Sequence, residues 1–196
     1  HQEVVCARRD LHADELVVFA QAAGDQAALA DVFKAGKLGL FDNAALGAQQ
    51  ENDFAAWQPD AVIVNLGTND TGAFDNPPWT DPATGKPHQL RRLSNGDFHP
   101  ADAQKVANGV QHFLTLLRAK NPGAKLVWCI GMLGSELLPV LRQGAEQYKA
   151  ITGDNSVYLL ELPNTTPETV GARQHPGAES HRQAAKVLTA FLKTIL

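Results

Sequence analysis

The fold of this chain is decided by the stretch Val62-Ile63-Val64-Asn65-Leu66-Gly67-Thr68-Asn69-Asp70. An apolar run ends abruptly on Gly-Thr-Asn-Asp, and Pro59-Asp60 precedes it. This pattern predicts a buried strand over 61–66 that delivers polar groups at its C-terminal end. In an open parallel sheet, ligands bind outside that end of the strands. We therefore expect an enzyme site beside Gly67 and Asn69.

Apolar runs and helical patterns alternate along the rest of the chain. Because the predicted strands lack polar alternation, both faces of their sheet should be buried. The alternation predicts an α/β domain with a parallel sheet covered by helices on both faces. We expect Asp102 and Ser135 to cap the helices that follow them. The expected elements are a helix tail at 3–11, strands at 15–20, 61–66, 125–130 and 157–160, and helices at 102–120, 135–151 and 178–196.

Composition and charge restrict the function. The 196 residues carry 44% hydrophobic residues and a net charge of −4, which suits one globular domain over 1–196. Basic residues do not gather beyond Arg8-Arg9 and Arg91-Arg92, so no nucleic-acid partner is expected. No apolar stretch is long enough to span a membrane. Cys129 lies in an apolar run and should be a small buried residue.

No motif in the sequence predicts a metal or a cofactor. Neither Gly-x-Gly-x-x-Gly nor Gly-Lys-Ser/Thr follows any predicted strand. A phosphate group bound at a strand end relies on such glycine-rich turns. The sequence therefore disfavours a nucleotide or phosphate binder.

Three loops that follow predicted strands should meet at one edge of the sheet. They carry Gly24, the pair Gly67 and Asn69, and His175 before Pro176-Gly177. The backbone N–H of a glycine and the side-chain N–H of an asparagine can stabilise an oxyanion together. A histidine can take the proton from a serine and return it to the leaving group. These are the groups that an acyl-transfer site needs besides its nucleophile.

These residues resemble the sequence blocks of the SGNH hydrolases, a superfamily of esterases and deacetylases. Gly67, Asn69 and Asp70 match its Gly-x-Asn-Asp block, and His175-Pro176 matches its last block. The segment 18–24 is similar to the one that ends in the second-block glycine. The segments 128–134 and 171–177 are similar to carbohydrate esterase family two, whose members remove acetyl groups from plant polysaccharides or oligosaccharides.

The resemblance implies a fold, an activity and a set of site residues. The fold would be flavodoxin-like, with three layers in the order α/β/α. The activity would be hydrolysis of a small acyl ester, with an acetylated saccharide as the substrate and no cofactor. His175 would be the catalytic base, and Asn69 and Gly24 would donate to the oxyanion. Gly67 and Trp79 would contact the substrate.

The sequence departs from the superfamily at two places. No serine precedes Ser94, so the opening strand and its Gly-Asp-Ser block are absent. We expect both upstream of His1, and we expect the 196 residues alone to be inactive. The position three residues before the histidine, often Asp, is Ala172. The site would then be a Ser-His dyad, with a backbone carbonyl or another group orienting His175.

The missing first strand also has a structural consequence. Without it, the strand at 15–20 becomes a sheet edge, and unpaired edges attract other strands. We expect that edge to pair with the missing N-terminal segment or with a second copy in a homodimer. The compartment is not fixed by the sequence, although a secreted or periplasmic location is compatible with it.

Other residues are weaker candidates for the same roles. His99-Pro100 is a second His-Pro dipeptide, but a strand precedes His175 and an amphipathic helix follows it. Ser135 sits at a strand–turn–helix junction, where serine is a preferred N-cap. A helical pattern surrounds Cys6, which argues against it as a nucleophile. Asp70 is interpreted as a structural residue of the turn.

Two choices stay open on the sequence. Trp79 in the long polar loop at 71–100 is either a platform for sugar stacking or a packing residue. Gly24 is either an oxyanion donor or an ordinary glycine at a strand end. A rival for the whole chain is a non-catalytic binding module with the same fold.

Overall fold

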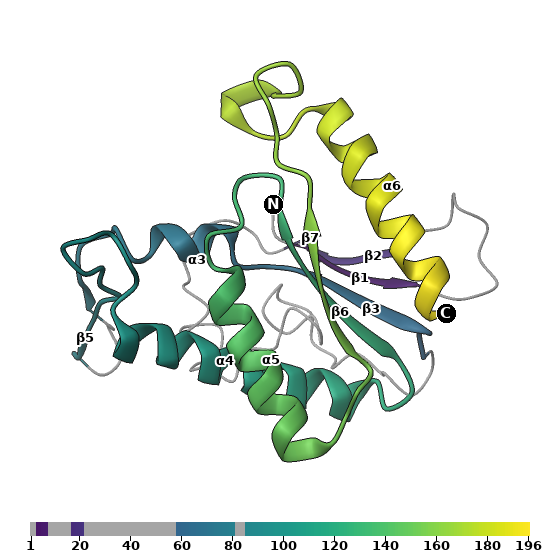
Figure 1. The fold of residues 1–196 in the computed structure, drawn as a ribbon, viewed down its shortest axis with the longest axis horizontal. Coiled ribbons are helices and arrows are strands. Elements are labelled where there is room, and N and C mark those ends of the chain that lie inside the picture. The colour runs from purple at the N-terminus through teal and green to yellow at the C-terminus, as the bar shows by residue number, and fades with distance from the viewer. Residues whose placement is uncertain (1–2, 8–16, 22–57, 81–84) are drawn as a thin grey trace.

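The computed structural model describes residues 3–7, 17–21, 58–80 and 85–196 (Figure 1). Five strands form one sheet in the order β2-β1-β3-β6-β7. β3 pairs in parallel with β6, and β6 pairs in parallel with β7, which confirms the predicted α/β architecture. The strands are β1 (Glu3–Ala7), β2 (Val17–Gln21), β3 (Ala61–Asn65), β6 (Lys125–Gly131) and β7 (Val157–Leu162).

The first strand differs from the prediction for this segment. Glu3–Ala7 is strand β1, not the tail of a helix, and it is antiparallel to both β2 and β3. The β-branched residues Val4 and Val5 favour a strand once neighbours offer backbone partners. Residues 8–16 are too few for a parallel crossover, which takes about a dozen residues or more. The sheet is therefore mixed on this side, and β2 lies at its edge as expected.

Both faces of the sheet are buried, as the apolar runs predicted. On β3, Val62 and Val64 belong to one core cluster while Ala61 and Ile63 belong to the other. β6 alternates in the same way, and its residues from Leu126 to Ile130 are at most 1% exposed. This period of two with apolar residues on both sides is typical of a sheet between two helical layers.

In the part of the chain that the structure describes, three long helices cover the sheet. α4 (Pro100–Lys120) and α5 (Leu138–Thr152) pack on one face, and α6 (Ala178–Ile195) covers the other (Figure 1). Trp128 of β6 packs edge-on against Phe113 of α4, with the ring centroids 5.7 Å apart. Among the described residues, no helix is long and apolar enough to cross a membrane.

Two helices begin at residues other than those predicted. α4 begins at Pro100 with His99 at the N-cap, so Asp102 lies inside the first turn and does not cap it. Proline at the first position of a helix loses no hydrogen bond, because that N–H has no partner in any case. α5 begins at Leu138, again with a proline in its first turn. Ser135 therefore does not cap α5. Its carbonyl accepts from the Leu138 N–H instead.

The polar segment before α4 contains three short elements. They are α3 (Thr68–Gly72), β4 (Trp79–Thr80) and β5 (Pro87–His88), where β4 and β5 form a two-stranded hairpin. Figure 1 shows these elements extending to one side of the sheet beside the start of α4. We call the described residues 68–80 and 85–99 the arm.

Asp102 has a structural role that the sequence did not reveal. Its carboxylate is fully buried and accepts hydrogen bonds from Arg91 Nε at 2.7 Å and Lys105 Nζ at 2.6 Å. Burial raises the Asp102 pKa, but the bonds from Arg91 and Lys105 outweigh it and lower the pKa to about 2. Asp102 thus joins the arm to the first turn of α4.

This arrangement predicts an acid-sensitive contribution to stability. A carboxyl whose pKa falls on folding stabilises the protein above its unfolded pKa, and the contribution disappears as the pH falls through the folded pKa. For Asp102 the window runs from about pH 4 down to about pH 2, and the contribution is about 2 kcal/mol. Urea unfolding of the wild type and Asp102→Asn should show a stability difference that shrinks by this amount between pH 5 and pH 2. A difference that does not vary with pH would contradict the assignment.

Candidate functional site

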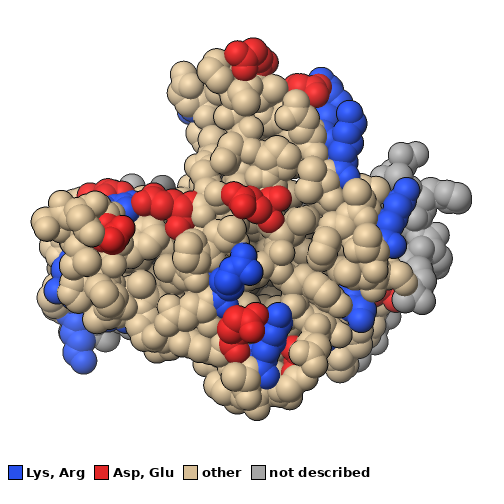
Figure 2. Space-filling model, in the orientation of Figure 1, with Lys and Arg blue, Asp and Glu red and all other residues tan. Residues whose placement is uncertain are grey.

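Three loops lie at one edge of the sheet because β3, β6 and β7 are parallel neighbours. The strand register pairs Asn65 with Cys129 and Gly131 with Leu162, so the three C-terminal ends are level. α3 follows β3, the turn into α5 follows β6, and the loop that carries His175 follows β7. In Figure 2 the surface steps inward between the arm and the part above the sheet where this last loop and the start of α6 lie.

Gly67 makes the turn from β3 into α3. Its φ is +117°, a left-handed conformation that L side chains rarely adopt. A Cβ at this position would lie 3.3 Å from Ile130 Cδ1 and 3.4 Å from Leu141 Cδ1. The Gly67 carbonyl accepts from the backbone N–H of Thr71 at 3.1 Å. The glycine thus lets the chain leave a buried strand and start a helix within one residue.

After this turn, one polar residue lies at the surface and the next one is buried. Asn69 is exposed, while Asp70 is only 2% exposed. The indole Nε1 of Trp128 donates to the Leu66 carbonyl at 2.9 Å, and Trp128 itself is 1% exposed. The position of Asn69 therefore depends on a buried anchor in the neighbouring strand. An exposed amide on an anchored turn is suited to meet a developing oxyanion.

His175 follows a strained turn. η2 (Ala172–Gln174) is a single 3₁₀ turn, and Arg173 and Gln174 have φ values of +53° and +61°. Such conformations are uncommon for residues other than glycine and cost of order 1–3 kcal/mol each. The Gly171 N–H donates to the His175 carbonyl at 2.6 Å, which closes the turn. Strain of this kind is concentrated at functional sites.

The imidazole of His175 is exposed, and its Nδ1 lies 2.8 Å from the Arg173 carbonyl oxygen. A carbonyl oxygen only accepts, so the Nδ1 atom must carry the proton in this contact. In the neutral ring, Nε2 is then an acceptor that is available to take a proton. The group that contacts Nδ1 is thus a backbone carbonyl, which is one of the alternatives that the sequence left open.

The loop that carries His175 is fixed to α6 and to the loop after β6. The buried Ser180 hydroxyl lies 3.0 Å from the Thr169 carbonyl and 3.0 Å from Thr165 Oγ1. The Thr165 N–H donates to the Met132 carbonyl at 2.9 Å. Asn164 Oδ1 accepts from the Gly134 N–H at 3.0 Å. These contacts hold the His175 loop against the end of β6.

Gly131 ends β6 against the backbone of β7. Its φ is +140°, and a Cβ there would lie 2.2 Å from the Leu162 carbonyl oxygen. The neighbouring atoms belong to the backbone of Leu162, which cannot move aside as the end of a flexible side chain can. A side chain at position 131 would therefore push the ends of β6 and β7 apart. The next residue, Met132, also has a positive φ, of +63°.

Gly131→Ala should therefore be strongly destabilising, by more than about 3 kcal/mol, because backbone strain and overpacking are among the causes of the largest single-residue effects. The matched control is Gly72→Ala at the end of α3, where a Cβ meets nothing within 4 Å. That substitution should change stability by no more than about 1 kcal/mol. Urea unfolding of both variants tests the claim. Similar stabilities for the two would show that the contact with Leu162 does not constrain position 131.

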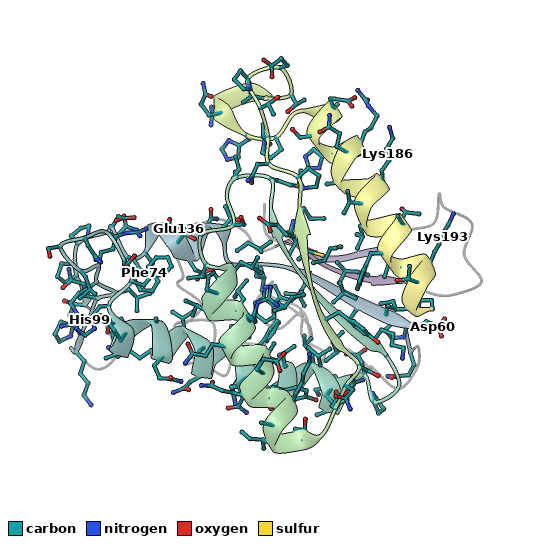
Figure 3. All side chains as sticks on the ribbon, in the orientation of Figure 1. Asp60, Phe74, His99, Glu136, Lys186 and Lys193 are labelled. Carbon is teal, nitrogen blue, oxygen red and sulfur yellow. The ribbon has the colours of Figure 1, made fainter. Side chains whose placement is uncertain are left out.

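The structure places the other predicted residues as follows. Trp79 lies in β4, paired with His88 of β5. Gly24 lies outside the described residues. His99 lies at the start of α4, with its Nδ1 atom 3.9 Å from Asp102 Oδ2. Figure 3 shows His99 at the far end of the arm, away from the loop that carries His175.

The two rival nucleophiles have other surroundings than predicted. The Ser135 hydroxyl donates to the Glu161 carboxylate of β7, which ties the loop after β6 to that strand. Cys6 lies in strand β1, so the helical pattern assigned to it was wrong. Cys129 is fully buried as predicted, and burial raises the pKa of its thiol to about 12.

Sequence reasoning missed the residues that hold the site together. Asn164 follows β7 and accepts from Gly134, and its only signal was an asparagine beside Pro163. The left-handed Arg173 and Gln174 carry no signal at all, because neither residue type favours that conformation. Within the described ranges, no three His, Cys, Asp or Glu side chains gather as a metal site.

A separate cavity of about 460 Å³ lies at the opposite end of the sheet, where the parallel strands β6 and β7 begin. It is bordered by residues that precede β6 and β7 and by the ends of α4 and α5, among them Arg118, Tyr148, Asp154 and Ser156. Arg118 Nε and Tyr148 Oη both donate to Asp154 Oδ2, at 2.8 and 2.9 Å. This cavity is distinct from the edge that carries Asn69 and His175.

Comparison with known proteins agrees with the observed fold. A sequence model of the GDSL-like Lipase/Acylhydrolase family matches residues 7–183. The chain is similar to an acetyl xylan esterase (Est2A) from the rumen bacterium Butyrivibrio proteoclasticus, with 45% sequence identity and a TM-score of 0.73. That match covers 78% of this chain and 41% of the esterase.

Two further relatives are more distant. The chain is 27% identical over 149 residues to the cellulase/esterase CelE of Acetivibrio thermocellus, covering 74% of this chain and 15% of that protein. A family two carbohydrate esterase from Clostridium thermocellum, solved in complex with cellohexaose, shares the fold with a TM-score of 0.53 at 24% identity. That match covers 76% of this chain and 39% of the esterase. The chain spans less than half the length of each of these three relatives.

Proposed function

This chain belongs to the GDSL-like Lipase/Acylhydrolase family, and on that premise we propose that it is a carboxylic-ester hydrolase that removes acetyl or other small acyl groups from carbohydrate. One observation carries the proposal. His175 stands on the same sheet edge as Asn69, with its Nδ1 atom held by the Arg173 carbonyl and its Nε2 atom available as a base. This is the arrangement that a serine-dependent acyl transfer needs.

The proposed reaction begins with a serine outside the 196 residues. Its hydroxyl oxygen attacks the ester carbonyl carbon while His175 Nε2 takes the hydroxyl proton. The carbonyl oxygen becomes an oxyanion, which the Asn69 side-chain N–H and the Gly24 backbone N–H stabilise. The imidazolium then returns its proton to the departing sugar oxygen, and an acyl-enzyme remains. Water, activated by the same histidine, releases the acid and restores the serine.

The direction of strand β1 is compatible with a nucleophile upstream of it. Glu3 pairs with Asn65 at the C-terminal end of β3, so β1 enters the sheet at the edge that carries Gly67 and Asn69. A segment preceding His1 would therefore meet the molecule beside the proposed site. In the proposed site the main-chain carbonyl of Arg173 orients the His175 imidazole, in the role that an acidic side chain would otherwise have.

The substrate class rests on the relatives. The similar protein from Butyrivibrio proteoclasticus is an acetyl xylan esterase. We propose an acetylated saccharide as the substrate of this chain, with Trp79 and Gly67 lining the position of the sugar. A non-catalytic saccharide-binding module is the second candidate, favoured by the lack of any serine before Ser94.

The test is an assay for acetate release from 4-nitrophenyl acetate and from acetylated xylan. It uses the chain extended by its natural upstream residues, next to the 196 residues alone. Release by the extended chain only is the expected result. Binding of the saccharide without release by either form would favour the binding module. Release by the 196 residues alone would show that the nucleophile lies within them.

A further inference from the structure

Arg92 joins two loops that lie at the proposed site. Its guanidinium binds Asp75 through Nε and Nη2, at 2.7 and 3.1 Å, and Glu136 through Nη1 and Nη2, at 2.6 and 3.2 Å. Nη1 also donates to the Gly96 carbonyl at 2.9 Å. These contacts use every N–H donor of the guanidinium. Two paired contacts from one arginine fix the distance and the angle between its partners.

The arm holds Arg92 in place. Arg92 and Phe98 face each other across a backbone bridge, and the guanidinium carbon lies 4.7 Å from the centre of the Phe98 ring. Phe98 in turn packs on the buried Phe74, with ring centroids 4.3 Å apart. The Arg92 side chain is 19% exposed, whereas Asp75 and Glu136 are 58% and 54% exposed. The arginine is thus the fixed member of the cluster.

Each of the two carboxylates is connected to one half of the proposed site. Asp75 is connected to the half with Asn69, and Glu136 to the half with His175. On one side, the Asp75 N–H donates to the Gly72 carbonyl at 3.0 Å, so Asp75 continues directly from the helix that carries Asn69. On the other side, Glu136 follows Ser135, whose hydroxyl donates to Glu161 of β7.

The second half of this connection runs through the loop after β6. Gly134 lies two residues before Glu136, and its N–H donates to Asn164 Oδ1 at 3.0 Å. Asn164 is the second residue of the loop that carries His175. Figure 3 shows Glu136 next to α3 and above Phe74, where basic and acidic side chains gather in Figure 2. One contact chain therefore runs from Asn69 through Arg92 to the base of the His175 loop.

We propose that Arg92 is a positioning residue, which sets the placement of the oxyanion donor Asn69 relative to the base His175. The inference rests on the function proposed above. Each of the two ion pairs of Arg92 involves a carboxylate that is more than half exposed, and pairs of this kind contribute roughly 0–1 kcal/mol to stability. A misplacement of about 1 Å at a reacting centre, however, can cost about 10²-fold in rate. Turnover should therefore respond to Arg92 far more than folding does.

The neighbouring arginine provides a matched control. Arg91 lies on the same arm and pairs with Asp102 in the first turn of α4. This pair does not join the two loops, because Asp102 lies in the first turn of α4, directly after the arm, and not in the loop after β6. Arg91→Gln and Arg92→Gln make the same change in charge and in side chain, one residue apart.

Esterase kinetics on the extended chain give the first readout. Arg92→Gln should lower kcat by about 10- to 100-fold with KM changed by less than about 3-fold. Arg92→Lys should recover only part of the loss, because an ammonium group cannot make two paired contacts. Arg91→Gln should keep kcat within about 2-fold. Equal kcat values for Arg92→Gln and Arg91→Gln would overturn the inference.

NMR gives a second readout that needs no catalysis. In ¹⁵N-labelled protein, Arg92→Gln should shift the signals of both the Asn69 side-chain amide and the His175 imidazole, and Arg91→Gln should shift neither. If the wild type hydrolyses no ester, the proposed function fails while this comparison still decides the role of Arg92. Unchanged Asn69 and His175 signals in Arg92→Gln would overturn the positioning role, whatever the activity.

Discussion

Replacing His175 by alanine should lower kcat for acetyl-ester hydrolysis by about 10²–10⁴-fold, which is the usual contribution of a general base. The reason is the geometry of the imidazole. Its Nδ1 proton is committed to the Arg173 carbonyl at 2.8 Å, so Nε2 is the atom that can take the serine proton. Without this base the serine stays a neutral, weak nucleophile. The measurement is steady-state hydrolysis of 4-nitrophenyl acetate by the extended chain.

The other His-Pro dipeptide provides the control. His99 lies at the N-cap of α4, 3.9 Å from the buried carboxylate of Asp102, at the far end of the arm (Figure 3). His99→Ala should leave kcat within a few-fold of the wild type. If His99→Ala abolished activity and His175→Ala did not, the two histidines would have been assigned the wrong way round.

Asn69→Ala should lower kcat by about 10²–10³-fold with a much smaller change in KM. Loss of one oxyanion donor typically costs this much, because the bond strengthens as charge develops in the transition state. Asn69 is suited to that role, since it is exposed on a turn that Gly67 and the Trp128 indole hold in place. Asn69→Asp keeps the shape and removes the N–H donor, so it should be as inactive as Asn69→Ala.

The matched control is Asn108, an exposed asparagine on α4 that accepts from Gln104. Asn108→Ala should leave both kcat and KM unchanged. A rise in KM with normal kcat in Asn69→Ala would mean that Asn69 binds the ground state of the substrate and does not stabilise the oxyanion. That result would move Asn69 from the oxyanion site to the sugar site.

Much of the fold was predictable because it depends on local patterns. β3, β6 and β7 are apolar on both faces, and α4 repeats its apolar residues at helical spacing, so their type and place follow from periodicity. The turn at Gly67 was also predictable, since a glycine after an apolar strand and before Asn-Asp is typical of a strand end at a site.

The remaining features of the fold and of the candidate site depend on contacts that no local sequence pattern encodes. Glu3–Ala7 became a strand because β2 and β3 offer it backbone partners on both sides. Asp102 and Ser135 looked like caps, but prolines in the first turns moved both helix starts and left the two side chains to distant partners, Arg91 and Glu161. The carbonyl that holds His175 belongs to a residue in a left-handed conformation that its own side chain does not favour.

The proposed mechanism depends on an activated serine upstream of His1, and covalent labelling detects such a serine. A fluorophosphonate reacts with a serine only when an adjacent base activates it. Peptide mass spectrometry on the labelled, extended chain should place the label on a serine upstream of His1, and His175→Ala should abolish the labelling. A label on Ser135 or any other serine within the 196 residues, or labelling that persists in His175→Ala, would contradict the proposed mechanism.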